Sequence, residues 1–477
     1  MSRVVIIGID GLDPFLIDKW RDVLPNFSSM YSDLPQSVLE STFPPDSICA
    51  WTSIFTGENP AEHGLLESID YLSAKKIKND ESRSSYIKGK TFWDIAGKQG
   101  KKVCVINPFL AYPAWEVNGV MISGPVFEGG ALSAFPEGFV EQYHFPQLGG
   151  IVDFPDKKKL PEFITRTQSI TEELAETGLK VYQDYDYDLF FITFLTLDRI
   201  KHFLWRFTDE DDIYYPGENP FQDSIKQFYV LFDKIVGRYK SSLRDDTTLL
   251  VISDHGHGRR CQKCLNLNEL LRLKGYLSTS GRGATGALKK IIEKTKVLTI
   301  AFMSTFGFQD WIYKIAKFIP NRKALKKSTY LIDKASSPVT LSNVCGTNPF
   351  GGMDISAGSA AEYEKLREQI IDELMGLNST LGANAVKWAV RREQLYRGLH
   401  EKRLPDVLFE LDGEYGVGMD LFTPLSSRNY THKKISGGHK KEGILLIYKN
   451  SEGIIKAKRP ESVMGVKDYV LNLIAAY

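Results

Sequence analysis

The chain has 477 residues, 43% of them apolar, and a formal net charge of +1. This length suits one large α/β domain with insertions, or two domains, and the apolar fraction is enough for a substantial core. The near-zero net charge excludes a bias of the whole chain toward nucleic acid or membrane surfaces.

The sequence gives no indication of secretion or of a membrane span. One Arg precedes the first apolar run, which is too short for a signal-peptide core. No apolar run reaches the roughly 18–20 residues of a transmembrane helix. The five cysteines are an odd number and mostly lie in apolar surroundings, which favours a reducing compartment. We therefore expect a cytoplasmic protein, and we interpret the Cys261 and Cys264 pair as packing residues rather than a zinc or redox site.

Apolar runs typical of strands buried on both faces of a parallel sheet recur along the chain. The first ends at Asp10, and the others are 101–107, 119–124, 188–195, 247–254, 405–411 and 443–448. Helical patterns lie between them, at 161–185 and 219–243. Strand–helix alternation of this kind predicts an α/β sandwich with a mostly parallel sheet.

Asp10 closes the first apolar run and is followed by Gly11. In an open α/β sheet, ligands usually bind at the edge formed by the carboxyl ends of the strands. A single Asp at such a position can equally be the N-cap of the next helix. Asp10 alone therefore leaves a ligand role and a capping role open.

The segment 44–64, PPDSICAWTSIFTGENPAEHG, predicts a helix that begins near Ser47 after a Pro-Pro-Asp turn. A hydroxyl there would lie beside free N–H groups and the positive end of the helix dipole, which stabilise a phosphate. A metal ion on the hydroxyl would lower its pKa and favour nucleophilic attack. The alternative is that Ser47 only caps the helix.

Asp198 follows the apolar run 188–195, and His202 comes four residues later. On a helix this spacing places both side chains on one face, where they could hold one cation. The motif is weak by itself, because a polar helix start with a hydrogen-bonded His has the same pattern.

The run 247–254 ends in Asp254 and His255, and two glycines then flank His257. A carboxylate beside an imidazole, where glycine lets the backbone turn, forms half of a metal site. For His257, a ligand or substrate contact and a structural or surface role both remain open.

The segment from Arg259 to Tyr330 is strongly basic, with sixteen Lys and Arg against three acidic residues. We predict a helical insertion or cap over 259–345, which would divide the main α/β domain into 1–258 and 346–477. A solvated basic face is the favoured interpretation. The alternatives are a collar for an anionic substrate and a peripheral membrane contact through 259–330.

His439 follows two glycines directly before the apolar run 443–448. A lone loop His is usually a surface residue, but glycines let the backbone bring an imidazole close to a ligand. Because the three acidic residues above all follow strands, one sheet edge would gather them, and the glycine loop could bring His439 there. Six oxygen and nitrogen ligands suffice for two divalent ions, each with an open position.

Five stretches of the chain resemble the alkaline phosphatase superfamily, and within it the type I phosphodiesterases, nucleotide pyrophosphatases and predicted phosphohydrolase/phosphomutase proteins. They are IGIDGLDP, STFPPDSICAWTSIFTGENPAEHGL, LTLDRIKHFLW, ISDHGHG and SGGHKKEGILL. They occur in family order and span nearly the whole chain. The resemblance implies an alkaline-phosphatase-like three-layer sandwich with a mostly parallel central sheet and an inserted helical cap.

The resemblance also implies a division of the ligands between two metal ions. One ion, which also holds the nucleophile, would be bound by Asp10, Asp254 and His255. The other would be bound by Asp198, His202 and His439.

The resemblance implies a nucleophile as well. In the nucleotide pyrophosphatases it is a Thr nine residues before a Thr-Gly pair. Counting back from Thr56 gives Ser47, which would then also be a metal ligand. Thr42, in STFPP, has the wrong distance and is the rival. His63 resembles a family residue that shapes the turn after the nucleophile helix.

The resulting hypothesis is a two-metal-dependent phosphoryl-transfer hydrolase that forms a covalent phosphoseryl intermediate on Ser47. Zinc is favoured because three of the six ligands are histidines, and manganese is the rival. A phosphodiesterase acting on a nucleotide, sugar-nucleotide or lipid-linked ester is preferred over a phosphomonoesterase or phosphomutase. The alternative from another class is a non-catalytic anion- or membrane-binding protein on this fold, which would be expected to lack ligands. No nucleic-acid-binding motif is found.

Overall fold

The computed structural model describes residues 3–65, 80–125, 130–148, 155–280, 331–450 and 457–475, with six isolated positions between 291 and 303. The side chains of 80–83 are not among the described ones. Most of the predicted basic segment beyond residue 280, including the helices expected there, therefore lies outside the described residues.

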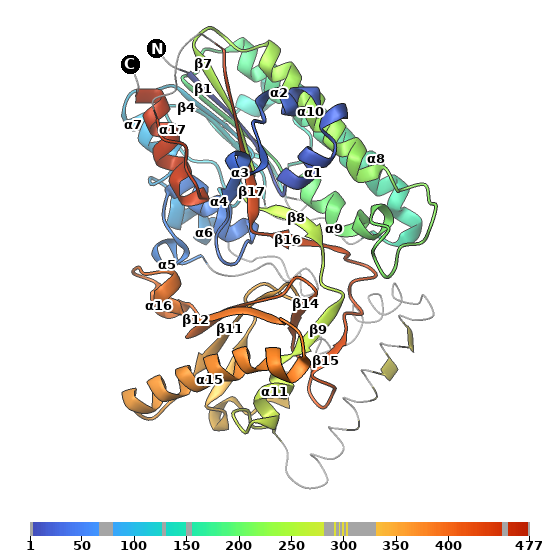
Figure 1. Cartoon of the computed structure of the whole chain (residues 1–477). Helices are drawn as coiled ribbons and strands as arrows, with labels where there is room; N and C mark the ends of the chain where they lie inside the picture. The colour runs from blue at the N-terminus through green and yellow to red at the C-terminus, as the bar shows by residue number, and fades with distance from the viewer. Residues whose placement is uncertain are drawn as a thin grey trace.

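The main lobe is built on an eight-stranded sheet with the order β2-β17-β7-β1-β6-β3-β4-β5 (Figure 1). Its strands are β1 (Arg3–Ile9), β2 (Val38–Glu40), β3 (Val103–Ile106), β4 (Gly119–Ser123), β5 (Ser133–Phe135), β6 (Leu189–Phe194), β7 (Thr247–Ile252) and β17 (Glu442–Lys449). The central strands β7, β1, β6, β3 and β4 are parallel. β17 and β5 join them antiparallel, and β2 pairs antiparallel with β17. The predicted mostly parallel sheet is confirmed.

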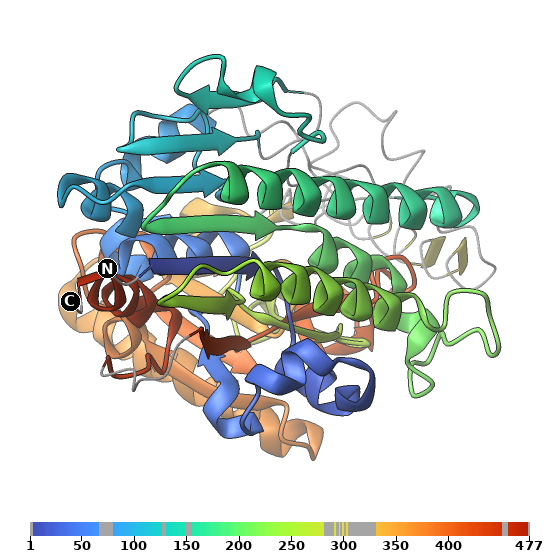
Figure 2. The same cartoon turned by 90° about the horizontal axis from the view of Figure 1, so that it is seen from above.

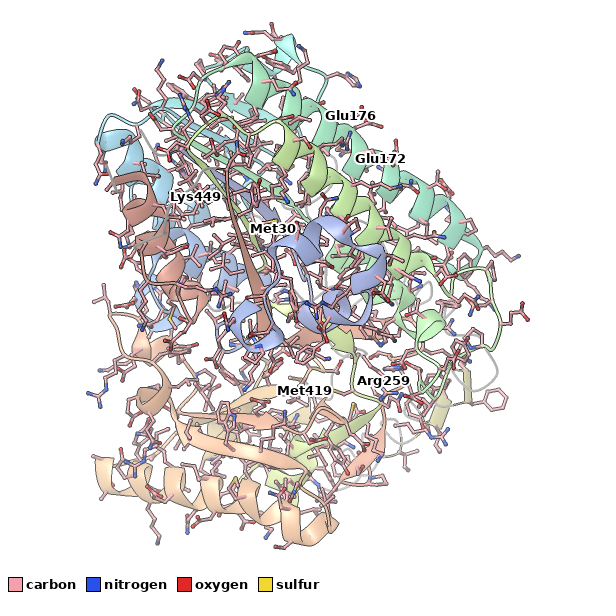
Figure 3. All side chains as sticks on the ribbon, turned by 45° about the horizontal axis from the view of Figure 1, so that its top comes forward. Met30, Glu172, Glu176, Arg259, Met419 and Lys449 are labelled. Atoms are coloured by element: carbon pink, nitrogen blue, oxygen red, sulfur yellow. The ribbon has the colours of Figure 1, made fainter. Side chains whose placement is uncertain are left out.

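Helices cover both faces of this sheet, which makes three layers (Figures 1 and 2). One face carries α1 (Pro14–Lys19), α2 (Pro25–Met30), α8 (Leu160–Asp184), α9 (Thr196–Thr208) and α10 (Ser224–Ser241). The other carries α4 (Ser47–Thr56), α7 (Phe92–Lys98) and α17 (Val466–Ala475). Successive side chains of β1 point to opposite faces of the sheet and so contribute to both apolar cores. Val5 and Ile7 pack on the first face, and Val4 and Ile6 pack on the second. The outer face of α8 is charged, with Glu172 and Glu176 pointing away from the sheet (Figure 3).

A second lobe comprises the described residues between 261 and 430 and lies below the main sheet in Figure 1. Its four-stranded antiparallel sheet has the order β10-β11-β13-β12. The strands are β10 (Val339–Ser342), β11 (Phe350–Ile355), β12 (Val386–Arg391) and β13 (Val407–Leu411). α11 (Leu267–Leu273) and α15 (Ala360–Leu381) share its apolar core. The run 405–411 was expected in the main parallel sheet, but it forms β13 here, because a short apolar run reads the same in any buried strand.

Two small sheets connect the lobes. β9 (Lys263–Asn266) pairs with β14 (Tyr415–Gly418) and β15 (Ser426–Arg428). β8 (Gly256–Arg259) and β16 (Gly437–Lys440) form an antiparallel ribbon. The remaining elements are short: α3 (Leu34–Ser37), α5 (Pro60–His63), α6 (Asp80–Ile87), α16 (Arg392–Leu395), and 3₁₀ turns at Arg21–Val23, Phe139–Gln142, Lys157–Lys159, Lys334–Ser336, Glu401–Arg403 and Val463–Gly465.

An aromatic contact joins the two lobes beside the start of α4. The ring of Phe43 packs at 5.8 Å from Phe350 and at 5.1 Å from Trp388, measured between ring centroids. The backbone N–H of Phe43 donates to the Tyr396 hydroxyl at 2.7 Å. The loop that leads into α4 is therefore held by side chains of the second lobe.

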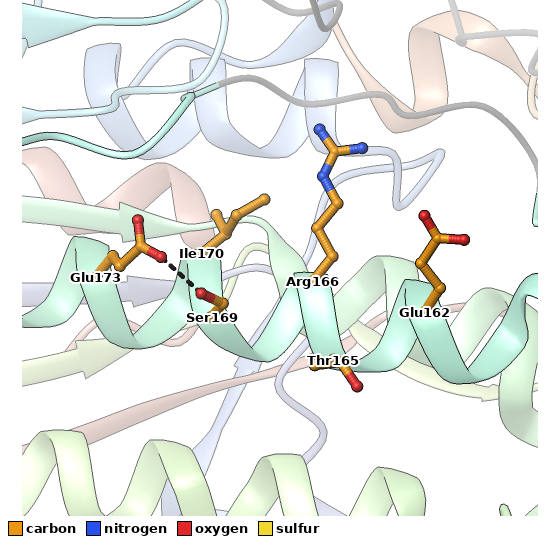
Figure 4. Close-up of a pocket in the computed structure, with 6 residues that line it drawn as sticks. All are labelled: Glu162, Thr165, Arg166, Ser169, Ile170 and Glu173. Atoms are coloured by element: carbon orange, nitrogen blue, oxygen red, sulfur yellow. Dashed lines mark hydrogen bonds between the residues drawn. The ribbon is translucent and has the colours of Figure 1, made fainter.

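No helix in the described part of the chain has the length and apolar character of a membrane span. All five cysteines are buried free thiols, as expected. A cavity of about 520 Å³ lies along α8, lined among others by Glu162, Arg166 and Glu173 (Figure 4).

His63, the last residue of α5, is held buried in one tautomer. The N–H of Leu65 donates to Nδ1 at 3.1 Å, so the ring proton is on Nε2, which lies 3.3 Å from the Ser53 hydroxyl. Burial, followed by the charges of Lys90 and His400, lowers the pKa of His63 to about 3. Protonation of Nδ1 would break this hydrogen bond and place two N–H groups opposite each other.

His63 should make the fold sensitive to acid. Its folded pKa lies below the unfolded value, so the stability it contributes is present above about pH 6.5 and is lost as the pH falls toward 3. Between pH 7 and pH 5 the free energy of unfolding should fall by about 2 kcal/mol more in the parent than in His63→Gln. Urea denaturation of both proteins at the two pH values measures this. An equal fall in both would contradict the assignment.

Candidate metal centre

Three neighbouring parallel strands deliver three carboxylates to one edge of the main sheet. Asp10 directly follows β1, Asp254 lies two residues beyond β7, and Asp198 lies in the first turn of α9 after β6. β1 pairs with both β6 and β7, so these strand ends are adjacent. The carboxyl edge of an open parallel sheet is where ligands bind in this fold class. Asp10 is not the cap of α1, since Asp13 accepts from the Leu16 N–H at 3.1 Å.

The histidines reach this edge from two directions. His202 lies one turn after Asp198 on α9, with Nε2 3.2 Å from Asp198 Oδ2. His439 lies on β16 and pairs with His257 across the ribbon. The His255 and His439 rings stack with centroids 4.0 Å apart.

The imidazoles of His202, His439 and His255 are each oriented by a backbone carbonyl at Nδ1. The pairs are His202 with Gly437 at 3.0 Å, His439 with Pro45 at 2.8 Å, and His255 with Gly256 at 2.9 Å. Because a carbonyl oxygen only accepts, Nδ1 carries a proton in each ring, and Nε2 is the ring nitrogen that faces the cluster. Burial, followed by the charge of His255, also lowers the pKa of His439 well below its usual value.

The Nε2 atoms of these histidines face one another and the carboxylates. His202 Nε2 lies 3.1 Å from His439 Nε2. His255 Nε2 lies 3.3 Å from Asp254 Oδ2 and 3.6 Å from Asp10 Oδ1. Lone pairs at these distances repel unless a cation lies between them. The donor set therefore fits metal ions.

The carboxylates give the same indication. Burial raises the pKa of Asp10, and the charges of Asp254 and Asp198 raise it further. Burial also raises the pKa of Asp254, whose Oδ2 is buried without a hydrogen-bond partner in the described residues. On Asp198 burial acts in the same direction, but His202 and His257 outweigh it, so its pKa lies well below the usual value. Uncompensated buried charge of this kind is costly unless it is paired or binds a metal.

Ser47 is the first residue of α4, and its hydroxyl faces this cluster. Ser47 Oγ lies 3.2 Å from His255 Nε2 and 3.4 Å from Asp10 Oδ1. The capping interpretation is wrong, because Asp46 caps α4 through the Ile48 N–H at 3.1 Å. Thr42 instead donates locally to the Pro44 carbonyl at 2.8 Å.

The structure thus brings all seven predicted site residues together. Asp10, Asp198 and His255 offer ligand atoms within 4.8 Å of one another. A second group with the same spacing contains Asp198, His202 and His439, together with His257. Asp198 belongs to both groups and lies between them.

Several contacts were not anticipated from the sequence. The Trp51 indole N–H donates to Asp10 Oδ2 at 3.0 Å, and its position four residues after Ser47 on one helix face could have indicated this. Lys201 is fully buried and donates to the Gly11 carbonyl, and burial lowers its pKa to about 8. Cys345 of the second lobe lies within 4.8 Å of Asp46 and His439, a proximity that sequence patterns do not reveal.

The family comparison agrees with this geometry. The description "Type I phosphodiesterase / nucleotide pyrophosphatase" matches residues 4–432. The chain belongs to the type I phosphodiesterase/nucleotide pyrophosphatase family. This confirms the resemblance seen in the sequence, and the family suggests phosphoryl transfer of the phosphodiesterase type. No curated protein matches the chain significantly.

Two solved structures of phosphonoacetate hydrolase from Sinorhizobium meliloti 1021 share the fold of this phosphodiesterase-family chain. The complex with phosphonoformate is 14% identical with a TM-score of 0.54, and the complex with phosphonoacetate is 13% identical with a TM-score of 0.55. Each match covers 99% of this chain and 96% of the other. They confirm the alkaline-phosphatase-like architecture.

The metal centre should bind two equivalents of zinc or manganese after stripping with EDTA and refilling. His202→Gln removes one donor of one group, and about one equivalent should then remain after gel filtration, measured by elemental analysis. His144→Gln, an exposed histidine, is the matched control and should keep both equivalents. Unchanged metal content in His202→Gln would contradict the assignment.

Proposed function

We propose that this protein is a two-metal-dependent phosphoryl-transfer hydrolase of the phosphodiesterase and nucleotide pyrophosphatase type. The observation that carries the proposal is the position of the Ser47 hydroxyl at the start of α4. It lies 3.2 Å from His255 Nε2 and 3.4 Å from the buried carboxylate of Asp10. A nucleophile beside a donor set for divalent ions is the arrangement that phosphoryl transfer requires. Five buried free thiols support a reducing, cytoplasmic setting.

Two groups of residues would hold the ions. Asp10, Asp254, His255 and Ser47 would hold one, and Asp198, His202 and His439 the other. Zinc is favoured by the histidine content, with manganese as the rival. When bound, the ions supply Lewis acidity and charge neutralisation for the phosphoryl group.

The chain itself supplies the nucleophile and its orientation. Ser47 Oγ attacks phosphorus, the ester bond to the leaving oxygen breaks as the Oγ–P bond forms, and the leaving oxygen takes a proton. A water molecule then attacks the phosphoseryl group, the Oγ–P bond breaks, and the hydroxyl regains its proton. The free N–H groups and the dipole at the start of α4 stabilise negative charge that develops on the phosphoryl oxygens.

The position of the nucleophile is fixed from both lobes. Trp51, on the same helix as Ser47, holds Asp10 Oδ2, so α4 orients both the nucleophile and a carboxylate beside it. Phe43 and its contacts with the second lobe fix the preceding loop. Orientation of this kind lowers the barrier by removing freedom before the reaction.

Exchange of Ser47 for Ala should abolish turnover of bis-p-nitrophenyl phosphate by protein refilled with zinc or manganese. We expect a fall in kcat of at least about 10³-fold, because no other described hydroxyl takes its place. Thr42→Ala is the matched control, and its kcat should stay within about threefold of the parent. Retained activity in Ser47→Ala with loss in Thr42→Ala would assign the nucleophile to Thr42.

The same proteins assayed with p-nitrophenyl phosphate distinguish the substrate classes. A higher kcat/KM for the diester supports the phosphodiesterase. A higher value for the monoester favours a phosphomonoesterase or phosphomutase of the same superfamily. Absence of turnover of both esters with both metals would favour a non-catalytic anion-binding protein on this fold.

A further inference from the structure

His257 is a buried imidazole whose role the two proposed ligand sets leave open. It lies on β8, pairs with His439 across the ribbon, and is fully buried. Its Nδ1 lies 2.8 Å from Asp198 Oδ1. His257 could be a metal ligand beside Asp198 or a hydrogen-bond donor to it. The interatomic distances distinguish these two roles.

The contact with Asp198 is shorter than the contacts among the proposed ligands. Asp198 lies 3.2 Å from His202 Nε2 through Oδ2 and 3.6 Å from His439 Nε2 through Oδ1. The two Nε2 atoms are 3.1 Å apart. Two ligands of one tetrahedral zinc ion lie about 3.3 Å apart, given metal–nitrogen bonds of about 2.0–2.1 Å. A separation of 2.8 Å is instead that of an N–H donating to a carboxylate. His257 therefore fits a donor better than a ligand.

The other ring nitrogen faces the backbone of the neighbouring strand. Nε2 of His257 has no hydrogen-bond partner in the described residues. A Cβ added at Gly437 would lie 2.4 Å from this nitrogen, so the backbone there covers it closely. With Nε2 covered and Nδ1 facing a carboxylate, the ring proton belongs on Nδ1.

The ring is also fixed in orientation. The backbone N–H of His257 donates to Asp13 Oδ2 at 3.2 Å. The Trp205 ring lies over the imidazole at a centroid distance of 6.0 Å, with 25° between the planes. The donor is therefore held in place by protein contacts.

We infer that His257 is a positioning residue that holds Asp198 through its Nδ1–H. The inference rests on the proposed metal centre and deepens it. Asp198 would be a ligand of one ion, and its ligand atom also lies within 4.8 Å of those of Asp10 and His255, so fixing its Oδ1 fixes a carboxylate that lies beside both ligand sets. Hydrogen bonds of this kind to metal ligands typically change metal affinity by 10- to 100-fold.

Metal affinity of three variants tests the inference, with a chromophoric chelator competing for zinc. In His257→Asn, the side-chain amide can place an N–H where Nδ1–H lies, and affinity should stay within about threefold of the parent. In His257→Gln the amide reaches too far, and in His257→Leu it is absent, so both should bind at least one equivalent about 10- to 100-fold more weakly. His144→Asn, at an exposed histidine, is the surface control.

Two results would overturn the inference. Parent-like affinity in His257→Leu and His257→Gln would show that Asp198 needs no such donor. Affinity in His257→Asn as low as in His257→Leu would make the imidazole itself a ligand. The visible spectrum of the cobalt-substituted proteins gives an independent readout, since replacing a coordinating imidazole alters the d–d bands whereas His257→Asn should leave them unchanged.

These measurements are separate from the proposed hydrolysis. If no ester is turned over but the affinity order holds, the positioning role stands and the proposed activity fails. If esters are turned over and all variants bind zinc equally, the activity stands and the positioning role fails. If His257→Leu does not fold, which circular dichroism of the stripped proteins checks, the comparison of Asn with Gln still decides.

Discussion

The local structure around the site depends on one electrostatic constraint, the crowding of buried carboxylates and imidazole nitrogens. Asp10, Asp198 and Asp254 lie at three adjacent strand ends, and the Nε2 atoms of His202 and His439 approach within 3.1 Å of each other. Such a set is unfavourable on its own and favourable around divalent cations. The carbonyls that orient the imidazoles therefore matter as much as the ligands, because they decide which nitrogen keeps the proton.

The rest of the architecture brings these groups to one place. The parallel strands supply the acidic residues, and α9 supplies His202 at helical spacing. The β8–β16 ribbon supplies His257 and His439, and His255 lies between β7 and β8. Lys201 and Asp13 lie beneath this layer, where Asp13 both caps α1 and accepts from the backbone of His257. The buried polar network thereby links the first helix of the chain to the ribbon near its end.

Much of this could be predicted from the sequence, for identifiable reasons. The acidic residues are visible because each ends an apolar run, and parallel strands share one carboxyl edge. Ser47 is found through the family resemblance, which places the nucleophile nine residues before Thr56-Gly57, and its hydroxyl faces the cluster. The antiparallel sheet of the second lobe could not be found in this way, because β13 has the apolar composition of a buried parallel strand.

The contacts that sequence reasoning missed have a common cause. The β8–β16 ribbon contains GHGR and GGHK, whose glycines do not indicate strands, so the register that sets His257 against His439 was invisible. Cys345 reaches the cluster only through the packing of one lobe on the other. Local patterns report which face a residue takes, whereas these contacts depend on how separate elements pack.

The packing of Phe43 against the second lobe limits how freely that lobe could be exchanged. The loop before Ser47 is anchored at one end in the second lobe, through Phe350, Trp388 and Tyr396, while Ser47 itself faces residues of the main lobe. The second lobe therefore helps to position the proposed nucleophile and is not an exchangeable accessory. A chimaera that takes this lobe from a relative therefore also needs side chains that pack around Phe43 as Phe350, Trp388 and Tyr396 do.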